Sequence, residues 1–218
     1  MIGTNKKAFE EILEMLDGST NVAVVGCGDC ATSCQTGGEK EVAEMSDLLA
    51  KKGKKITHAG VVEVGCDKRL VKKYFRDHHK DMHNTEAVLV LACGSGVQTA
   101  AEVFEKKVLP GLDSLFIGQI DNLSRFYERC SVCGECVLAD TGGICPITRC
   151  SKGLVNGPCG GSDKGKCEAD RENDCAWYLI FERMKKTDQF SKLTSLKKIK
   201  SYKASHGPRK IEIKRARG

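Results

Sequence analysis

Cysteine is the residue that most limits what this chain can fold into. The 218 residues include thirteen cysteines, and eight of them lie between residues 130 and 175. That stretch is rich in glycine and has almost no apolar periodicity, so the burial of side chains alone cannot organise it. Bound metal would supply the missing stabilisation. The sequence therefore predicts an irregular module that is built around metal–thiolate centres.

Disulfide bonds are the competing explanation for so many cysteines, and three features disfavour them. The first residues, "MIGTNKKAFEEILEMLDGST", form a charged amphipathic pattern without the apolar region of a signal peptide. An odd number of cysteines also suits complete pairing poorly. No run of about 18 apolar residues occurs, so we expect no membrane span. We therefore expect a cytoplasmic chain whose cysteines bind metal.

The first half of the chain alternates between strand and helix patterns. Such alternation predicts an α/β fold in which a small parallel sheet carries helices on both faces. Apolar residues at helical spacing predict helices over residues 9–16, 42–49, 68–79 and 97–108. Short runs rich in β-branched residues predict strands over residues 21–26, 56–65, 87–92 and 114–118.

The pattern changes near Arg129, where the cysteine-rich stretch begins. After it, "CAWYLIFERMKK" places apolar residues at helical spacing and predicts a helix that closes the module. From residue 184 onward, twelve Lys and Arg face only Asp188 and Glu212. We expect this basic tail to be a solvated or partner-docking extension, with nucleic-acid binding as the alternative. The expected domains are 1–128, 129–186 and 187–218.

A first group of cysteines follows the predicted strands. Cys27, Cys30 and Cys34 come directly after "NVAVVG", and Cys66 and Cys93 each follow a later strand. Because parallel strands share one carboxyl edge, these thiols should gather there. Four thiolates would hold one [4Fe–4S] cluster, with either Cys66 or Cys93 as the fourth ligand. The alternative is that those two cysteines are merely small buried residues.

The second group begins with "CSVCGEC", three thiols with two residues between each pair. Such a triple can wrap three corners of one cubane, as in the ferredoxin run C-x2-C-x2-C-x3-C-P. Here the "CP" pair follows after eight residues rather than three. Two clusters, or one cluster and one zinc ion, both fit eight thiols, and the absence of a later C-x2-C pair favours zinc. The group comprises Cys130, Cys133, Cys136, Cys145, Cys150, Cys159, Cys167 and Cys175.

Other signals for chemistry are weak. The glycine-containing pieces "GCG" and "CGSG" do not complete a G-x-G-x-x-G frame, and no flavin or nicotinamide motif occurs. The histidines of "RDHHKDMH" fit a solvated helix end better than a metal site. No nucleophile and base can be paired, so the residues indicate no catalytic centre.

The stretch "CSVCGECVLADTGGICPITRCSKGLVNGPCGG", followed by "GKCEADRENDCAWYLIFERMKK", resembles a known family. It is similar to the MetV-type iron–sulfur subunits of two-subunit methylenetetrahydrofolate reductases from acetogenic and related bacteria. The same stretch resembles the cysteine-rich methylenetetrahydrofolate reductase C-terminal domain. "VVGCGDCATSCQTGGEKEVA" and "LACGSGVQT" extend the resemblance over nearly all of the chain except the basic tail.

The resemblance implies a non-catalytic electron-transfer subunit in the one-carbon (Wood–Ljungdahl) metabolism of acetogenesis. Its partner would be a MetF-type flavoprotein that carries the FMN and reduces methylene-tetrahydrofolate to methyl-tetrahydrofolate. Ferredoxin or another donor subunit would supply the electrons. We expect two [4Fe–4S] clusters, together with one zinc ion or a third cluster.

Two functions from other classes compete with this one. The cysteine-rich region could be a zinc-built structural adaptor of an enzyme complex that transfers no electrons. It could also be a nucleic-acid-binding zinc protein that uses its basic tail. Iron and sulfide in anaerobically purified protein would favour the first hypothesis, and zinc alone would favour the others.

Overall fold

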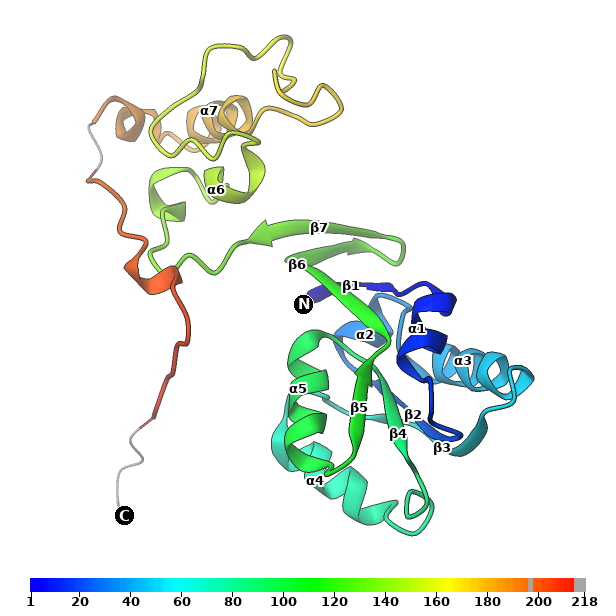
Figure 1. Ribbon diagram of the computed structural model, residues 1–218. Coiled ribbons are helices and arrows are strands. Elements are labelled where there is room, and N and C mark those ends of the chain that lie inside the picture. Colours follow the sequence, from blue (N-terminus) through cyan, green and yellow to red (C-terminus); the bar gives the residue numbers. More distant parts are fainter. Residues whose placement is uncertain (196–197, 214–218) are drawn as a thin grey trace. The chain divides into compact units, whose positions relative to one another are not determined.

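The computed structural model describes residues 1–195 and 198–213. The chain forms two compact units, Met1–Tyr127 and Glu128–Gly218. Figure 1 shows the first unit as the blue-to-green part of the chain and the second as the yellow-to-red part. The expected division into three domains stays a prediction.

A four-stranded parallel sheet forms the centre of the first unit, in the order β3-β2-β4-β5. The two middle strands are buried along almost their whole length because helices cover both faces, which explains their continuous apolar sequence. The strands are β2 (Asn21–Cys27), β3 (Lys55–Val62), β4 (Ala87–Leu91) and β5 (Lys107–Pro110).

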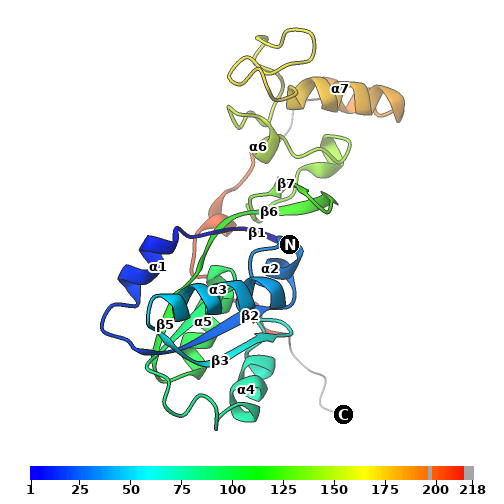
Figure 2. The same ribbon diagram turned by 90° about the vertical axis from the view of Figure 1, so that its right-hand side faces the viewer.

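Helices cover the two faces of this sheet, with α3 on one side and α4 and α5 on the other (Figures 1 and 2). In α3, Val42, Met45 and Leu49 recur at helical spacing and are buried. The helices are α1 (Phe9–Met15), α2 (Cys30–Ser33), α3 (Glu39–Lys51), α4 (Lys68–Asp77) and α5 (Gly94–Val103). The α/β class with a small parallel sheet and flanking helices is confirmed.

A second sheet of three strands was not expected. It has the order β1-β6-β7, with β1 antiparallel to β6. The predicted strand at 114–118 is part of β6, so it extends this sheet and not the parallel one. Residue Ile2 pairs with Ile117, and no local pattern could reveal a partner that far along the chain. The strands are β1 (Ile2–Lys6), β6 (Leu112–Asn122) and β7 (Arg125–Cys130).

The helix predicted over residues 97–108 was too long. Helix α5 ends at Val103, and Val108 lies in strand β5, where it pairs with Val88 of β4. Val108 matches helical spacing only by coincidence. Its β-branched side chain suits the edge of a parallel sheet, and the tertiary pairing overrides the periodicity.

The second unit is irregular and has few buried apolar side chains. Helix α7 contributes Trp177, Ile180 and Met184, which form the centre of its small core. The predicted closing helix is therefore confirmed. Its helices are η1 (Leu138–Asp140), α6 (Pro146–Arg149), α7 (Ala176–Lys186), η2 (Phe190–Thr194) and η3 (Lys203–Ser205). In the described ranges, no helix has the length and apolar character that crossing a membrane requires.

Candidate metal–thiolate sites

Cys27 lies at the carboxyl end of β2, and its side chain is buried. The backbone N–H of Gly65 donates to its sulfur at 3.3 Å, and the Cys27 amide donates to the carbonyl of Gly37 at 2.9 Å. Backbone N–H groups directed at a sulfur stabilise its thiolate form, which is the form that binds metal. The buried thiol is thus held at the edge of the sheet in an environment that suits a ligand.

Cys66 and Cys93 lie beside Cys27 at the same sheet edge. Burial raises the pKa of the Cys66 thiol, and the neighbouring Cys93 and Cys27 raise it further. Cys93 is the N-cap residue of α5, directly after β4. Three separate segments therefore bring their thiols close together at this edge, and their role as metal ligands stays a prediction.

Cys30 is the first residue of the short helix α2, Cys34 is its C-cap residue, and both contact the start of β1. The Cys34 thiol donates to the carbonyl of Ile2 at 3.7 Å. Burial raises the pKa of Cys30, the backbone N–H of Ile2 opposes that rise, and Asp29 adds to it. Strand β1 was absent from the sequence prediction, so its contribution to this site could not be anticipated.

In the second unit, Cys130 is the last residue of β7, and Cys133 and Cys136 lie on the loop that follows it. Val132 and Gly134 adopt left-handed conformations, with φ of 54° and 84°. The turn at Val132 directs its N–H toward the Cys130 sulfur at 3.4 Å. Such N–H···S bonds are what a loop that presents thiolates to a metal needs.

Helix α6 connects this loop to the following cysteines. Cys145 is its N-cap residue and Cys150 its C-cap residue. The Thr148 hydroxyl in α6 donates to the carbonyl of Arg129, the neighbour of Cys130, at 3.2 Å. This bond connects α6, which has a cysteine at each end, to the residue that precedes the triple-cysteine loop.

The last cysteines gather around the chain that follows Cys150. The Cys167 thiol donates to the Ser151 hydroxyl at 3.6 Å, and the Cys175 amide donates to the carbonyl of Gly165 at 2.8 Å. Cys159 contacts Glu168, the neighbour of Cys167, at 3.4 Å. The hydrogen bond with the Ser151 hydroxyl, and then those with the backbone of residues 170 and 169, lower the pKa of Cys167.

The thiols are neighbours without being gathered at a metal-binding distance. Over residues 1–195 and 198–213, no three Cys, His, Asp or Glu side chains are arranged to hold a metal ion. All thirteen cysteines are free thiols. In a tetrahedral zinc site each sulfur lies about 2.3 Å from the metal. The donor type and the N–H···S bonds fit thiolate ligation, and the side chains must still converge to achieve it.

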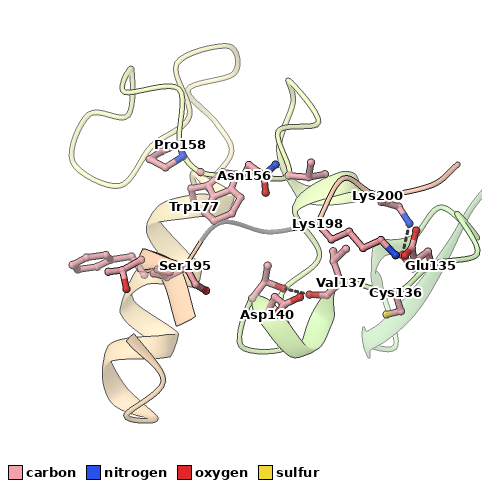
Figure 3. A pocket seen from close by; sticks show the side chains of 16 residues that line it. Glu135, Cys136, Val137, Asp140, Asn156, Pro158, Trp177, Ser195, Lys198 and Lys200 are labelled. Atoms are coloured by element: carbon pink, nitrogen blue, oxygen red, sulfur yellow. Dashed lines mark hydrogen bonds between the residues drawn. The ribbon is translucent and has the colours of Figure 1, made fainter. Parts of the chain in front are cut away.

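A pocket of about 440 Å³ adjoins the triple-cysteine loop. Figure 3 shows Glu135, Cys136, Lys198 and Lys200 on one side of it and Trp177 on another. The Trp177 ring is held in place by the bond from its Nε1 to the carbonyl of Leu154 at 2.9 Å. One of the proposed ligands, Cys136, is therefore accessible from this pocket. No local sequence pattern could predict this pocket, because its walls come from four separate segments.

A further cluster in the first unit escaped sequence reasoning. His58 on β3 contacts the Tyr74 hydroxyl at 2.7 Å, and its ring lies 4.7 Å from that of His78. Burial, and then His78, lower the pKa of His58. Burial alone raises the pKa of Tyr74 to about 12. These histidines pack as half-buried partners of α4, and the four-residue spacing of Tyr74 and His78 was the available signal.

These features define an α/β protein with thiols at its sheet edge, joined to a cysteine-rich module. Residues 109–203 match a family model described as "Methylene-tetrahydrofolate reductase C terminal". The match runs from β5 into η3, includes all eight cysteines of the second unit and spans less than half of the chain. It relates this part of the chain to the C-terminal region of methylene-tetrahydrofolate reductases. No curated protein and no solved structure matched the chain.

Proposed function

We propose that this chain is the iron–sulfur electron-transfer subunit of a two-subunit methylenetetrahydrofolate reductase, of the MetV type. The placement of Cys27, Cys66 and Cys93 at one sheet edge supports a metal centre there. The family match to residues 109–203 supports the reaction. Iron–sulfur clusters held by such thiolates would carry single electrons.

The chain's own residues would hold these centres in three places. In the first unit the ligands would be Cys27, Cys30 and Cys34 with either Cys66 or Cys93. In the second unit the eight thiols would hold two four-thiolate centres, either two clusters or one cluster and one zinc ion. The amides of Gly65 and Val132 would stabilise the bound thiolates through their N–H···S bonds.

Reduction of the folate would take place on the partner, a MetF-type flavoprotein that carries FMN. The sequence contains no flavin or nicotinamide fingerprint, so hydride chemistry is assigned to that partner. Ferredoxin or another donor subunit would supply the electrons. The reaction would take place in the cytoplasm, as part of the one-carbon metabolism of acetogenesis.

Metal analysis of anaerobically purified protein tests the proposal. Cys30→Ser should lower the iron content by about one cluster's worth, because a cubane rarely survives the loss of a thiolate. Ser33→Ala, an exposed position in the same short helix, is the control and should keep its iron. Cys66→Ser and Cys93→Ser, tested separately, would identify the fourth ligand. Unchanged iron in Cys30→Ser would remove this site from the proposal.

Activity supplies the second test. The isolated, metal-loaded chain should not reduce methylene-tetrahydrofolate, whereas addition of the flavoprotein partner should restore turnover. Turnover by the chain alone would contradict the electron-transfer role.

A structural adaptor built on zinc is the second candidate function. The observation behind it is the small apolar core of the second unit, which gives bound metal a structural role that requires no electron transfer. Zinc without iron or sulfide in the anaerobic protein would decide for the adaptor.

A further inference from the structure

The basic segment 200–209 lies along the triple-cysteine loop and contacts it at several points. The Lys200 ammonium donates to the carbonyl of Glu135, and the Ser201 amide donates to the Glu135 carboxylate at 2.6 Å. Lys200 is only 9% exposed although it carries a charge. Figure 3 shows its side chain reaching Glu135 next to Cys136.

Two more contacts lie farther along the same segment. The Arg209 guanidinium donates to the carbonyl of Val132 at 2.8 Å and to the carbonyl of Ala204 at 2.9 Å. The methyl group of Ala204 packs so closely on Gly134 that a Cβ at Gly134 would overlap it. Arg209 therefore fixes both the loop and the segment that lies on it.

These contacts of the segment do not involve the cysteine side chains. The residues contacted are Val132, Gly134 and Glu135, which are the spacers between the three thiols. Val132 uses both sides of its backbone, because its N–H faces the Cys130 sulfur and its carbonyl accepts from Arg209. The segment thus satisfies carbonyl groups with charged donors while the thiols remain available to a metal.

The charges of the segment also suit its position. A centre held by four thiolates carries net negative charge, and nearby cations and hydrogen bonds stabilise it. Lys200 and Arg209 place two cations on the carbonyls that immediately precede Cys133 and Cys136. A purely solvated tail, or one reserved for nucleic acid, would have no reason to make these contacts.

We propose that residues 200–209 form a strap that holds the Cys130–Cys136 loop in its ligand-presenting shape and slows the loss of its metal. The inference rests on the proposed function, since it needs a metal centre on this loop. Because coupling between two sites is reciprocal, the bound metal should in turn hold the strap in place.

The test compares two variants that remove the same charge from neighbouring positions. Arg209→Gln loses the bonds to Val132, whereas Lys210→Gln loses a residue whose ion pair, with Glu212, lies within the tail. Anaerobic full-length protein is treated with bipyridyl for iron and with a pyridylazo-resorcinol dye for zinc. Release from Arg209→Gln should be about three- to tenfold faster than from wild type, the range expected for the loss of such hydrogen bonds. Release from Lys210→Gln should match wild type.

Two readouts that do not depend on activity accompany the metal assay. Hydrogen exchange at the amides of residues 130–136 should rise in Arg209→Gln and stay unchanged in Lys210→Gln. Trypsin should cut the wild-type chain after Lys200, Lys203 and Arg209 faster once metal has been removed. Equal release and equal exchange in the two variants would overturn the strap and leave the proposed function intact. A wild-type chain that holds no metal would overturn both.

Discussion

Two glycines, Gly26 and Gly37, allow backbone segments to approach closely next to Cys27. A Cβ on Gly26 would overlap the carbonyl oxygen of Gly37, and a Cβ on Gly37 would overlap the carbonyl oxygen of Leu91. Backbone atoms cannot move aside as the end of a flexible side chain can, so the close approach requires glycine. The same approach forms the bond from the Cys27 amide to the Gly37 carbonyl.

Replacement of Gly37 by alanine should therefore destabilise the first unit. We expect Gly37→Ala to lower the free energy of unfolding by about 1–3 kcal/mol, the usual cost of overpacking. Urea unfolding followed by far-UV circular dichroism measures it. Gly94→Ala is the control, because a Cβ there meets only the Ser114 hydroxyl at 3.7 Å. Equal stability of the two variants would show that the backbone around Cys27 can adjust.

His58 should make the first unit sensitive to mild acid. Burial and the neighbouring His78 lower its pKa, and Asp81, 3.9 Å from Nδ1, opposes them. When the pKa of a histidine is lower in the folded state, a fall in pH protonates it in the unfolded chain first and in the folded chain only at a lower pH. The folded state therefore keeps its full stability above the unfolded pKa of about 6.5 and loses stability as the pH falls below it.

The pH dependence can be measured on one variant. Between pH 7.5 and 5.5, the wild-type chain should lose more of its free energy of unfolding than His58→Gln does. Proton NMR of the wild type should also give His58 a titration midpoint below that of a free histidine. An identical pH dependence in the two proteins would indicate that Asp81 outweighs burial at this residue.

At the scale of elements, helix α7 carries most of the apolar packing in the second unit. Ile180 and Met184 are completely buried and Trp177 nearly so, whereas Phe181 on the other side is exposed and stacks edge-on with Phe190. The core has few other members, so each of these side chains contributes a large share of the stability of the unit.

Truncation of Ile180 should show this dependence. Ile180→Ala is expected to lower the free energy of unfolding of the second unit by about 2–4 kcal/mol, since it removes a fully buried side chain. Trp177 is the only tryptophan, so its emission reports on this unit alone. Lys185→Ala, exposed on the same helix, is the matched control. An unchanged urea midpoint for Ile180→Ala would mean that metal, not α7, determines the stability of the unit.

At the scale of the whole molecule, the two units are stabilised in different ways. The first has a continuous core of apolar side chains from the parallel sheet and its helices. The second has only a small cluster of buried apolar side chains around α7. It also contains eight cysteines. A chain segment that buries so little needs another source of stability, and metal binding would provide it.

Removal of metal should therefore unfold the second unit and leave the first unit folded. A chelator with a reductant, applied anaerobically, should expose Trp177 and shift its emission to the red, while circular dichroism retains much of the helical signal of the first unit. The reason is that α7, which carries Trp177, begins directly after Cys175, a proposed ligand. Unshifted emission in demonstrably metal-free protein would show that the module folds without its centres.

The sequence by itself determined the α/β class because local periodicity reports which residues face a core. The helices near Phe9, Lys68 and Trp177 and the strands β2 and β4 follow from such patterns. Which sheet a strand joins is a non-local choice, and there the patterns failed. Strand β6 pairs with β1 and does not belong to the parallel sheet, and Val108 lies in β5 and not in the predicted helix.

The contacts of the candidate site can likewise be divided into those that local sequence patterns predict and those that they do not. That Cys27, Cys66 and Cys93 meet was predictable, because the carboxyl ends of neighbouring parallel strands lie at one edge by geometry. The strap was not predictable, since Arg209 meets Val132 across 77 positions of irregular chain. Contacts of that kind depend on where loops without periodicity come to lie. The sequence thus determined which residues are candidate metal ligands, and only the tertiary structure decided which of them are neighbours and which segments contact them.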